Sequence, residues 1–184
     1  MALLPDFAEL PPQQQELVAC SISAGLAYEV PVNVVLAVAE QEGGQPGRWL
    51  KNTDGSYDVG ALQFNTAYLR ELRRYGITPQ AVAQAGCYPY RLAAWRLRGH
   101  LRHDAGDVWT RAANYHSRTP RFNARYRSQL MRRALQWNRW LSRQFDTHAD
   151  TRVLALPPSP PARMPSDRRV ETGAAVLHEQ GAPS

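Results

Sequence analysis

The sequence predicts a mainly α-helical domain followed by a disordered tail. Apolar residues recur at helical spacing up to about residue 144, and no alternating apolar and polar pattern of useful length predicts a long strand. Prolines and glycines stand where helices would begin and end. At 184 residues the chain is long enough for one domain with a hydrophobic core.

Two helices are predicted before residue 45. The first begins at Pro11–Pro12, before Gln13, because proline is tolerated in the first turn of a helix, and it continues to about Tyr28. The second begins at Val32 and ends at Glu42, before two glycines that can cap a helix. The apolar face of the first helix is formed by Leu17, Val18, Ile22 and Leu26.

The rest of the domain is predicted to be helical after one loop. Residues 52–60 have turn chemistry and predict a loop or short irregular strands. Further helices are predicted at residues 66–74, from Pro79, at residues 90–103 and at residues 124–144. Asp107 is predicted to cap one more helix, which carries Val108, Ala112 and Tyr115. The helix at 124–144 has an amphipathic stripe. The stripe consists of Tyr126, Leu130, Ala134, Trp137 and Leu141.

The proline-rich residues 147–184 lack apolar periodicity and predict a disordered tail. The expected organisation is an N-terminal extension at 1–12, a domain at 13–146 and this tail.

The tail holds four arginines and four acidic residues, so the net charge of +6 belongs to the domain. That charge attracts polyanions, including nucleic acid, anionic membranes and the bacterial wall. No apolar run is long enough to span a membrane, and no nucleic-acid motif accompanies the arginines.

Glu42 is the leading candidate for chemistry. It ends a nearly all-apolar helix, where the helix dipole and desolvation both disfavour a charged carboxylate and raise its pKa. A raised pKa suits a general acid near neutral pH. Glu40 lies about 200° around the helix from Glu42, so the two side chains cannot both face one site. Gly43 and Gly44 leave space for a bulky sugar and favour Glu42. The alternative is an exposed residue at a helix end.

Residues 52–65 supply the other half of the candidate site. Gly60 allows positive φ, and the amides of Gln63 and Asn65 suit sugar hydroxyls and N-acetyl groups. The alternative is a well-built turn with no ligand. The stretch lacks the acidic spacing of an EF-hand, and no cluster has metal-ligand spacing, so neither a metal nor another cofactor is expected. The turn-forming residues are Asp54, Gly55, Ser56 and Asp58.

Two further features bear on compartment. Cys20 and Cys87 permit either one disulfide or two buried free thiols, and the sequence does not choose between them. Residues 1–15 contain no basic n-region, long apolar segment or cleavage site, so no signal peptide is predicted.

The order of these motifs resembles the lytic transglycosylases of the lysozyme-like superfamily, which cut bacterial peptidoglycan. The soluble lytic transglycosylase-like domain has an apolar helix ending in E-S-G, then Asn, then G-S-x-D-x-G-L-M-Q-I-N. This chain has E-G-G at 42–44, Asn52 and G-S-Y-D-V-G-A-L-Q-F-N at 55–65. Y-G-I-T at 75–78, Cys87, N-Y-H-S at 114–117 and T-P at 119–120 are similar to members associated with type III and type IV secretion. The resemblance covers about residues 17–143.

The resemblance implies a goose-type, lysozyme-like helical fold with a short irregular or β region. It implies cleavage of the β-1,4 bond between N-acetylmuramic acid (MurNAc) and N-acetylglucosamine (GlcNAc), with a 1,6-anhydro product. The enzyme is expected to be a periplasmic monomer that opens the wall for a secretion or conjugation apparatus. Gly43 replaces the usual serine, and Ala61-Leu62 replaces Leu-Met. The implied roles are Glu42 as sole acid/base, Ser56, Gly60, Gln63 and Asn65 in the glycan groove, Tyr115 beside Glu42, and Cys20 bonded to Cys87.

Two alternatives remain. A hydrolytic muramidase of similar fold needs a second carboxylate, and none is evident because Asp54 and Asp58 are placed in a structural turn. A non-catalytic basic adaptor would bind nucleic acid or secretion-machine components, although no nucleic-acid partner is expected. His116 is expected to be structural, and the arginines of residues 118–143 are expected to form a solvated helix face.

Overall fold

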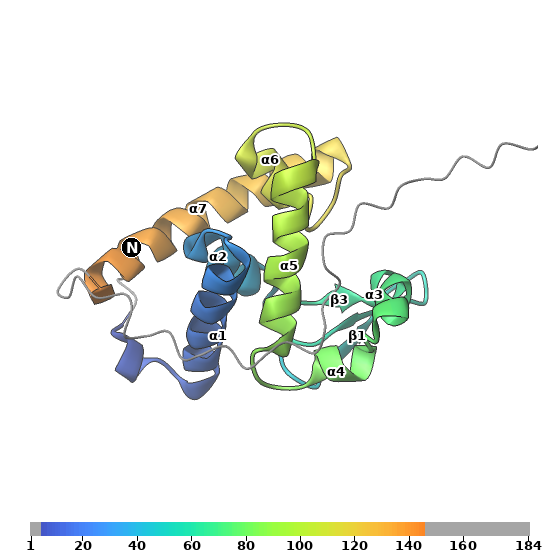
Figure 1. Cartoon of the computed structure of the whole chain (residues 1–184), viewed down its shortest axis with the longest axis horizontal. Coiled ribbons are helices and arrows are strands. Elements are labelled where there is room, and N and C mark those ends of the chain that lie inside the picture. Colours follow the sequence, from blue (N-terminus) through green and yellow to red (C-terminus); the bar gives the residue numbers. More distant parts are fainter. Residues whose placement is uncertain (1–4, 146–184) are drawn as a thin grey trace, which may run out of the picture.

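The computed structural model describes residues 5–145 and confirms the predicted fold class (Figure 1). Helices make up most of this part, and the arrangement is consistent with a lysozyme-like fold. The predicted tail at 147–184 lies outside the described residues. The helices are α1 (Pro12–Tyr28), α2 (Val32–Glu42), α3 (Thr66–Leu72), α4 (Pro79–Ala83), α5 (Tyr88–His103), α6 (Val108–Ala113) and α7 (Pro120–Phe145), with 3₁₀ turns η1 (Phe7–Glu9) and η2 (Arg73–Tyr75).

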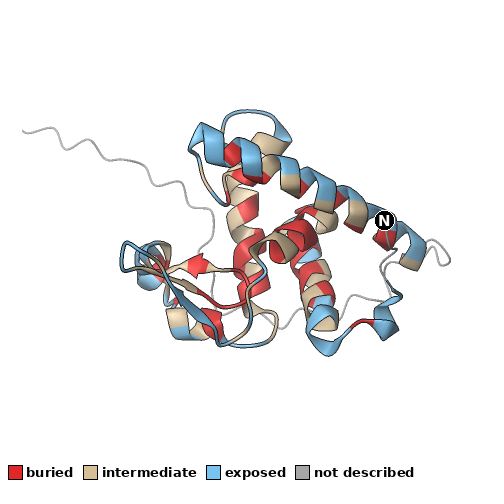
Figure 2. Ribbon diagram, turned by 180° about the vertical axis from the view of Figure 1, so that it is seen from behind, coloured by how far each residue is buried: buried red, intermediate tan, exposed pale blue. Residues whose placement is uncertain are grey.

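Helix α2 forms the centre of the helical part. It contacts α1, α5 and α7, and residues 34–39 are all buried (Figure 2). This explains why its sequence is apolar on every side. The helix ends at Glu42 because Gly43 adopts the left-handed conformation, with φ of 59°, and donates its N–H to the carbonyl of Ala39. The end of the most buried helix is therefore fixed in place.

Helix α7 covers one side of α2. Its buried residues recur every three or four positions, and its outer face is exposed (Figure 2). The helix begins at Pro120, four residues before the predicted start. Residues near the N-terminus pack on its far end, where the indole N–H of Trp140 donates to the carbonyl of Pro5 at 2.8 Å. The buried positions are Asn123, Tyr126, Leu130, Ala134, Trp137 and Trp140.

The short strands β1 (Trp49–Lys51), β2 (Tyr57–Val59) and β3 (Phe64–Asn65) form one antiparallel sheet in the order β1-β2-β3. Trp49 pairs with Val59, and Val59 pairs with Phe64. Figure 1 shows the sheet with α3 and α4 beside α5, on the side away from α1. Glu42 is followed directly by the segment that leads into this sheet, so the end of α2 lies where the two parts meet.

A disulfide joins α1 to the start of α5. Cys20 lies on α1 and Cys87 is the residue before α5, and their sulfur atoms are 2.01 Å apart. The bond closes a sequence separation of 67 residues. It fixes α5, which stands between the other helices and the sheet.

Several local predictions were wrong. Leu26, predicted on the apolar face of α1, has 57% of its surface exposed. The helix capped by Asp107 ends at Ala113, so Tyr115 lies beyond it. Asp58 lies on β2 rather than in the preceding turn.

Within the described residues, no helix is long and apolar enough to cross a membrane.

Candidate active site

Glu42 is half-buried at the C-terminus of α2 and contacts α7. The hydroxyl of Tyr126 donates a hydrogen bond of 2.6 Å to Glu42 Oε1. Burial raises the pKa of Glu42 to about 7, against the lowering effects of the Tyr126 hydrogen bond and the charge of Arg96, and the charge of Asp58 raises it further. A carboxyl group with this pKa is available both as an acid and as a base near neutral pH.

Glu40 differs from Glu42 in its partners. Its carboxylate pairs with Arg133 of α7, and its Oε2 accepts the indole N–H of Trp137 at 2.8 Å. Both interactions satisfy the charge of Glu40 on the side of α2 that faces α7. Glu42 has no arginine paired with it among the described residues, so its environment suits proton transfer better.

Gly44 does not leave space for a sugar, contrary to the expectation. Its N–H donates to the carbonyl of Ala61 at 3.1 Å. A Cβ atom there would lie 2.2 Å from the carbonyl oxygen of Gly60 and 2.6 Å from Nε2 of Gln63. Gly44 therefore allows the backbone after α2 to approach the turn that ends β2. Gly43 is open, with only the carbonyl of Glu40 near its missing Cβ, at 3.6 Å.

Ser56 and Asn65 belong to one hydrogen-bonded network in the sheet. Asn65 Nδ2 donates to Ser56 Oγ at 2.9 Å and to Asp58 Oδ1 at 3.0 Å. Asn65 Oδ1 caps α3 by accepting the N–H of Ala67 at 2.8 Å. Ser56 Oγ in turn donates to Asp54 at 2.7 Å. These bonds hold β2 against β3 and fix the position of the Asp58 carboxylate.

Gln63 and Gly60 form the turn between β2 and β3. Gln63 has a φ of 48° and donates its side-chain amide to the carbonyl of Gly60 at 3.0 Å. Gly60 has a φ of 71°, and a Cβ atom there would lie 2.6 Å from the carbonyl oxygen of Val82. The structure thus gives both residues a role in shaping the wall next to Glu42, and their contact with a glycan stays a prediction.

Tyr115 lies near Glu42 but does not hold it. Its hydroxyl donates to the carbonyl of Leu62 at 3.4 Å. The side chain is buried, and the charge of Glu42 contributes to a pKa for Tyr115 well above its ordinary value, behind the larger effect of burial. The hydrogen bond to Glu42 comes from Tyr126.

Sequence reasoning missed the role of Tyr126. The residue was placed in the apolar stripe of α7, where it does lie buried. Burial and the nearby Glu42 keep its pKa well above the ordinary value, so its hydroxyl stays protonated and can donate. A tyrosine in an otherwise apolar stripe is a usable signal, because a buried tyrosine hydroxyl needs a hydrogen-bond partner.

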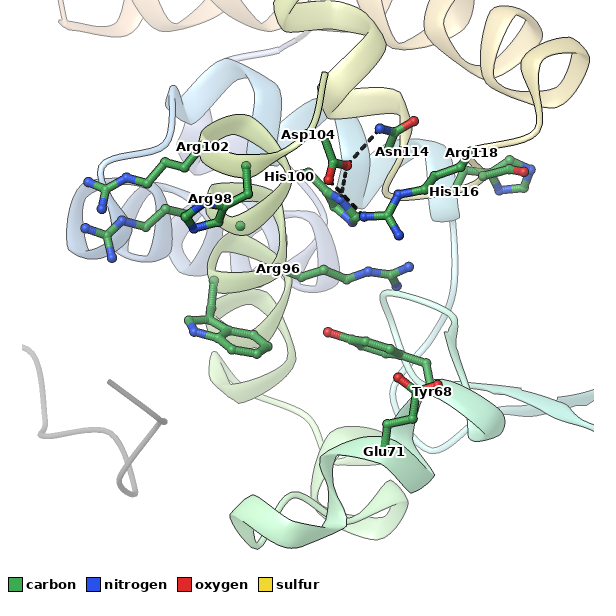
Figure 3. Close-up of a pocket in the computed structure, with 14 residues that line it drawn as sticks. Tyr68, Glu71, Arg96, Arg98, His100, Arg102, Asp104, Asn114, His116 and Arg118 are labelled. Carbon is green, nitrogen blue, oxygen red and sulfur yellow. Dashed lines mark hydrogen bonds and ion pairs between the residues drawn. The ribbon is translucent and has the colours of Figure 1, made fainter. Parts of the chain in front are cut away.

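A pocket of about 590 Å³ lies beside this site, between α3, α5 and the segment after α6 (Figure 3). Arg96 lines it, and so does His116, whose ring stacks on Tyr126 with centroids 4.8 Å apart. Because the Tyr126 hydroxyl donates to Glu42, two stacked rings, those of His116 and Tyr126, connect the pocket lining to the carboxyl group. The lining includes four arginines and three histidines against two carboxylates.

No group of three or more histidine, cysteine, aspartate or glutamate residues within 5–145 is placed to hold a metal ion. The arrangement offers one carboxyl group with a pKa near neutrality, a tyrosine that orients it and a basic pocket alongside. Such a site can give a proton to a leaving oxygen and take one from a hydroxyl group.

Fold and site together define a mainly helical, lysozyme-like domain with a half-buried glutamate at the end of its central helix. None of the known protein-family models matches this chain. The chain is 30% identical over 101 residues to invasion protein IagB of Salmonella typhimurium, and the match covers 54% of this chain and 62% of that protein. Protein IpgF of Shigella flexneri is 28% identical over 101 residues, covering 54% of this chain and 66% of that protein. The chain therefore spans less than two thirds of the length of these relatives.

Proposed function

We propose that this protein is a peptidoglycan lytic transglycosylase. The observation that carries the proposal is Glu42, a half-buried carboxyl group with a pKa of about 7 and a hydrogen bond from Tyr126. The reaction needs one group that is first an acid and then a base, and a pKa near neutrality serves both steps. The order of motifs along the chain supports the same reaction.

In the proposed reaction, Glu42 gives its proton to the oxygen that links N-acetylmuramic acid to N-acetylglucosamine. The bond from C1 of the muramic acid to that oxygen breaks, and positive charge develops at C1. The ionised Glu42 then takes the proton of the C6 hydroxyl as O6 bonds to C1. The product has a 1,6-anhydro ring, Glu42 is protonated again, and no water is consumed.

A hydrolytic muramidase is the second candidate, and one observation favours it. Asp58 lies on β2, and its charge acts on Glu42, raising its pKa. Asp58 Oδ1 accepts a hydrogen bond from Asn65. A second carboxylate held at a fixed place near the acid is what a hydrolase uses to activate water or to bond to the sugar. Asp58→Asn separates the two mechanisms, since only a hydrolase depends on this carboxylate for chemistry.

The setting we propose is local opening of the bacterial wall for a secretion or conjugation apparatus, with the protein acting in the periplasm. One relative carries the name invasion protein, which supports a role beside machinery directed at other cells. The net charge of +6 favours binding to the acidic wall. A non-catalytic adaptor would have no need of a carboxyl group with a raised pKa.

Digestion of purified peptidoglycan tests the proposal. Wild type, Glu42→Gln and Asp58→Asn are incubated with sacculi, and the released muropeptides are resolved by mass. We expect anhydro-muropeptides from wild type and from Asp58→Asn, and none from Glu42→Gln. Reducing ends from wild type that disappear in Asp58→Asn would favour the muramidase. Equal release by wild type and Glu42→Gln would refute both.

A further inference from the structure

Arg96 is held rigidly in the pocket beside Glu42. Its guanidinium carbon lies over the ring of Tyr68, 4.3 Å from the ring centre, and over that of Tyr115, at 4.5 Å, so the cation contacts two aromatic rings. Such contacts stabilise an arginine and fix its orientation. Figure 3 shows the side chain of Arg96 reaching from α5 into the hollow between Tyr68 and Arg118.

The charge of Arg96 is not neutralised by the residues that the structure describes. No carboxylate within 5–145 forms an ion pair with it, and its buried Nε has no hydrogen-bond partner there. The cation lowers the pKa of both Glu42 and His116 in addition to other influences. A half-buried cation of this kind is stabilised when an anion binds beside it.

Two carboxylates, Asp104 and Glu71, and one further arginine, Arg118, face the same pocket as Arg96. The Asp104 carboxylate accepts hydrogen bonds from Asn114, Arg118 and His100, which lower its pKa to about 2 against the opposing effect of burial. Its charge is thus shared among three donors. Glu71 lies at the opposite edge, on α3 (Figure 3).

The two remaining arginines of the pocket lining have a partner elsewhere. Arg98 and Arg102 point to the other side of α5 in Figure 3, and both pair with Glu29. Arg118 does matter, because it stands at the rim with 69% of its side chain exposed while it contacts Asp104 at 2.9 Å. Its guanidinium group has further N–H donors that can reach an incoming anion while the contact with Asp104 is kept.

We propose that this pocket is an anion subsite that binds a carboxylate carried on the lactyl arm of a muramic acid residue, with Arg96 as its central contact. The inference rests on the proposed function and adds to it the part of the substrate that gives specificity. In intact peptidoglycan the lactyl group is amide-linked to a peptide stem that bears carboxylates, and in stripped strands the lactyl carboxylate is itself free. Arg96 and Arg118 suit either source, because guanidinium groups bind carboxylates in a two-point geometry.

Binding to three tetrasaccharides tests the subsite in the Glu42→Gln background, where no cleavage occurs. The ligands are a peptidoglycan tetrasaccharide with peptide stems, the same sugar stripped by an amidase, and neutral chitotetraose. We expect the stem-bearing ligand to bind about tenfold more tightly than chitotetraose, as one well-oriented charged contact supplies. Tight binding of the stripped ligand as well would assign the contact to the lactyl carboxylate, and weak binding would assign it to the stem.

Variants of Arg96 identify the contact. Arg96→Gln should bring the stem-bearing ligand within about twofold of chitotetraose, without changing the affinity for chitotetraose, and Arg96→Lys should restore part of the preference because the charge returns. Arg125→Gln is the matched control, since Arg125 is exposed on α7 and has no ion pair within the described residues. Arg118→Gln, at the exposed rim, should lower the preference for the stem-bearing ligand over chitotetraose about two- to threefold. It replaces Arg96→Gln as the test if that variant does not fold.

The outcomes separate the two proposals. Equal binding of charged and neutral ligands by Glu42→Gln, or an unchanged preference in Arg96→Gln and Arg118→Gln, would overturn the anion subsite and leave the proposed function standing. Failure to bind any of the three sugars, together with the absence of cleavage by wild type, would overturn both.

Discussion

Two opposing influences act on the carboxyl group of Glu42. Burial raises its pKa, and the hydrogen bond from Tyr126 together with the charge of Arg96 lowers it. The result, a pKa of about 7, lies where a single group can exchange protons in both directions. The acid form is needed for the first step, so we expect activity to fall as the pH rises through the pKa.

Tyr126→Phe tests this balance. Removing a hydrogen bond that favours the ionised form raises the pKa of Glu42, so the alkaline fall in activity should move to higher pH. We expect a shift of roughly one pH unit, because a hydrogen bond to a charged group is worth roughly 1.5 kcal/mol and a pKa unit about 1.36 kcal/mol. The rate of muropeptide release is measured between pH 5 and pH 9 (roughly the range that brackets the pKa).

Tyr28→Phe is the control for this change, because Tyr28 lies at the end of α1 and makes no contact with Glu42 that the structure records. It should leave the pH profile as in wild type. If the activity of Tyr126→Phe falls at the same alkaline pH as that of wild type, the role given to Tyr126 is contradicted.

At this scale the sequence identified Glu42 as a candidate, because a glutamate at the end of an apolar helix has a raised pKa on elementary grounds. It did not identify Tyr126 or Arg96 as its neighbours. Tyr126 is 84 residues away from Glu42 in sequence, and only packing of α7 on α2 brings the two together. Such contacts are not encoded in any local pattern.

Among the elements, the turn between β2 and β3 positions the wall of the site. Gly60 has a φ of 71°, and the carbonyl oxygen of Val82 lies 2.6 Å from the place that a Cβ atom would take. Gly55 has a φ of 84° with nothing within 4 Å of that position. Substituting each glycine in turn therefore separates the effect of backbone strain from the effect of close packing.

Gly60→Ala should lower the free energy of unfolding by about 2–4 kcal/mol, from a left-handed alanine and a close contact together. Gly55→Ala, with strain alone, should lower it by about 1–2 kcal/mol. Urea denaturation of both variants measures the difference. Equal losses would mean that α4 yields to the extra methyl group.

Element bounds followed from local chemistry where a cap or a proline marks the end. Helix α2 begins after Pro31 and ends before Gly43, as predicted, and Thr78 and Asp107 cap α4 and α6 through their side chains. The first turn of α7 was missed because Arg121 and Phe122 are exposed there and continue no apolar stripe. Three strands of two or three residues are too short for alternation to show.

For the whole molecule, the disulfide between Cys20 and Cys87 links distant parts of the chain. It ties α1 to α5, and α5 carries the pocket and stands beside the sheet. Cross-linking across 67 residues restricts the unfolded chain. We expect Cys20→Ser with Cys87→Ser to lower the free energy of unfolding by about 2–4 kcal/mol.

Denaturation of the double variant, beside wild type with and without reductant, measures this loss. The reduced wild type should match the variant. Equal stability of oxidised and reduced protein would show that the bond does not stabilise the domain, and the packing of α1 on α5 would then hold α5 alone.

The arrangement of the helices and the sheet around one site could not be read from the sequence by pattern alone. Residues 42, 58, 96 and 126 come from α2, β2, α5 and α7, and the fold gathers them. Apolar periodicity predicted a mainly helical domain, and resemblance to a known family implied its lysozyme-like arrangement. The structure adds the pocket and the partners of Glu42.

Digestion of peptidoglycan in water enriched with oxygen-18 tests the central claim most directly. If Glu42 acts as both acid and base, O6 of the muramic acid closes the ring, so wild type should release 1,6-anhydro products without the heavy isotope and Glu42→Gln should release none. Products with reducing ends that carry one oxygen-18 atom at C1 would show that water attacks, and would contradict the mechanism.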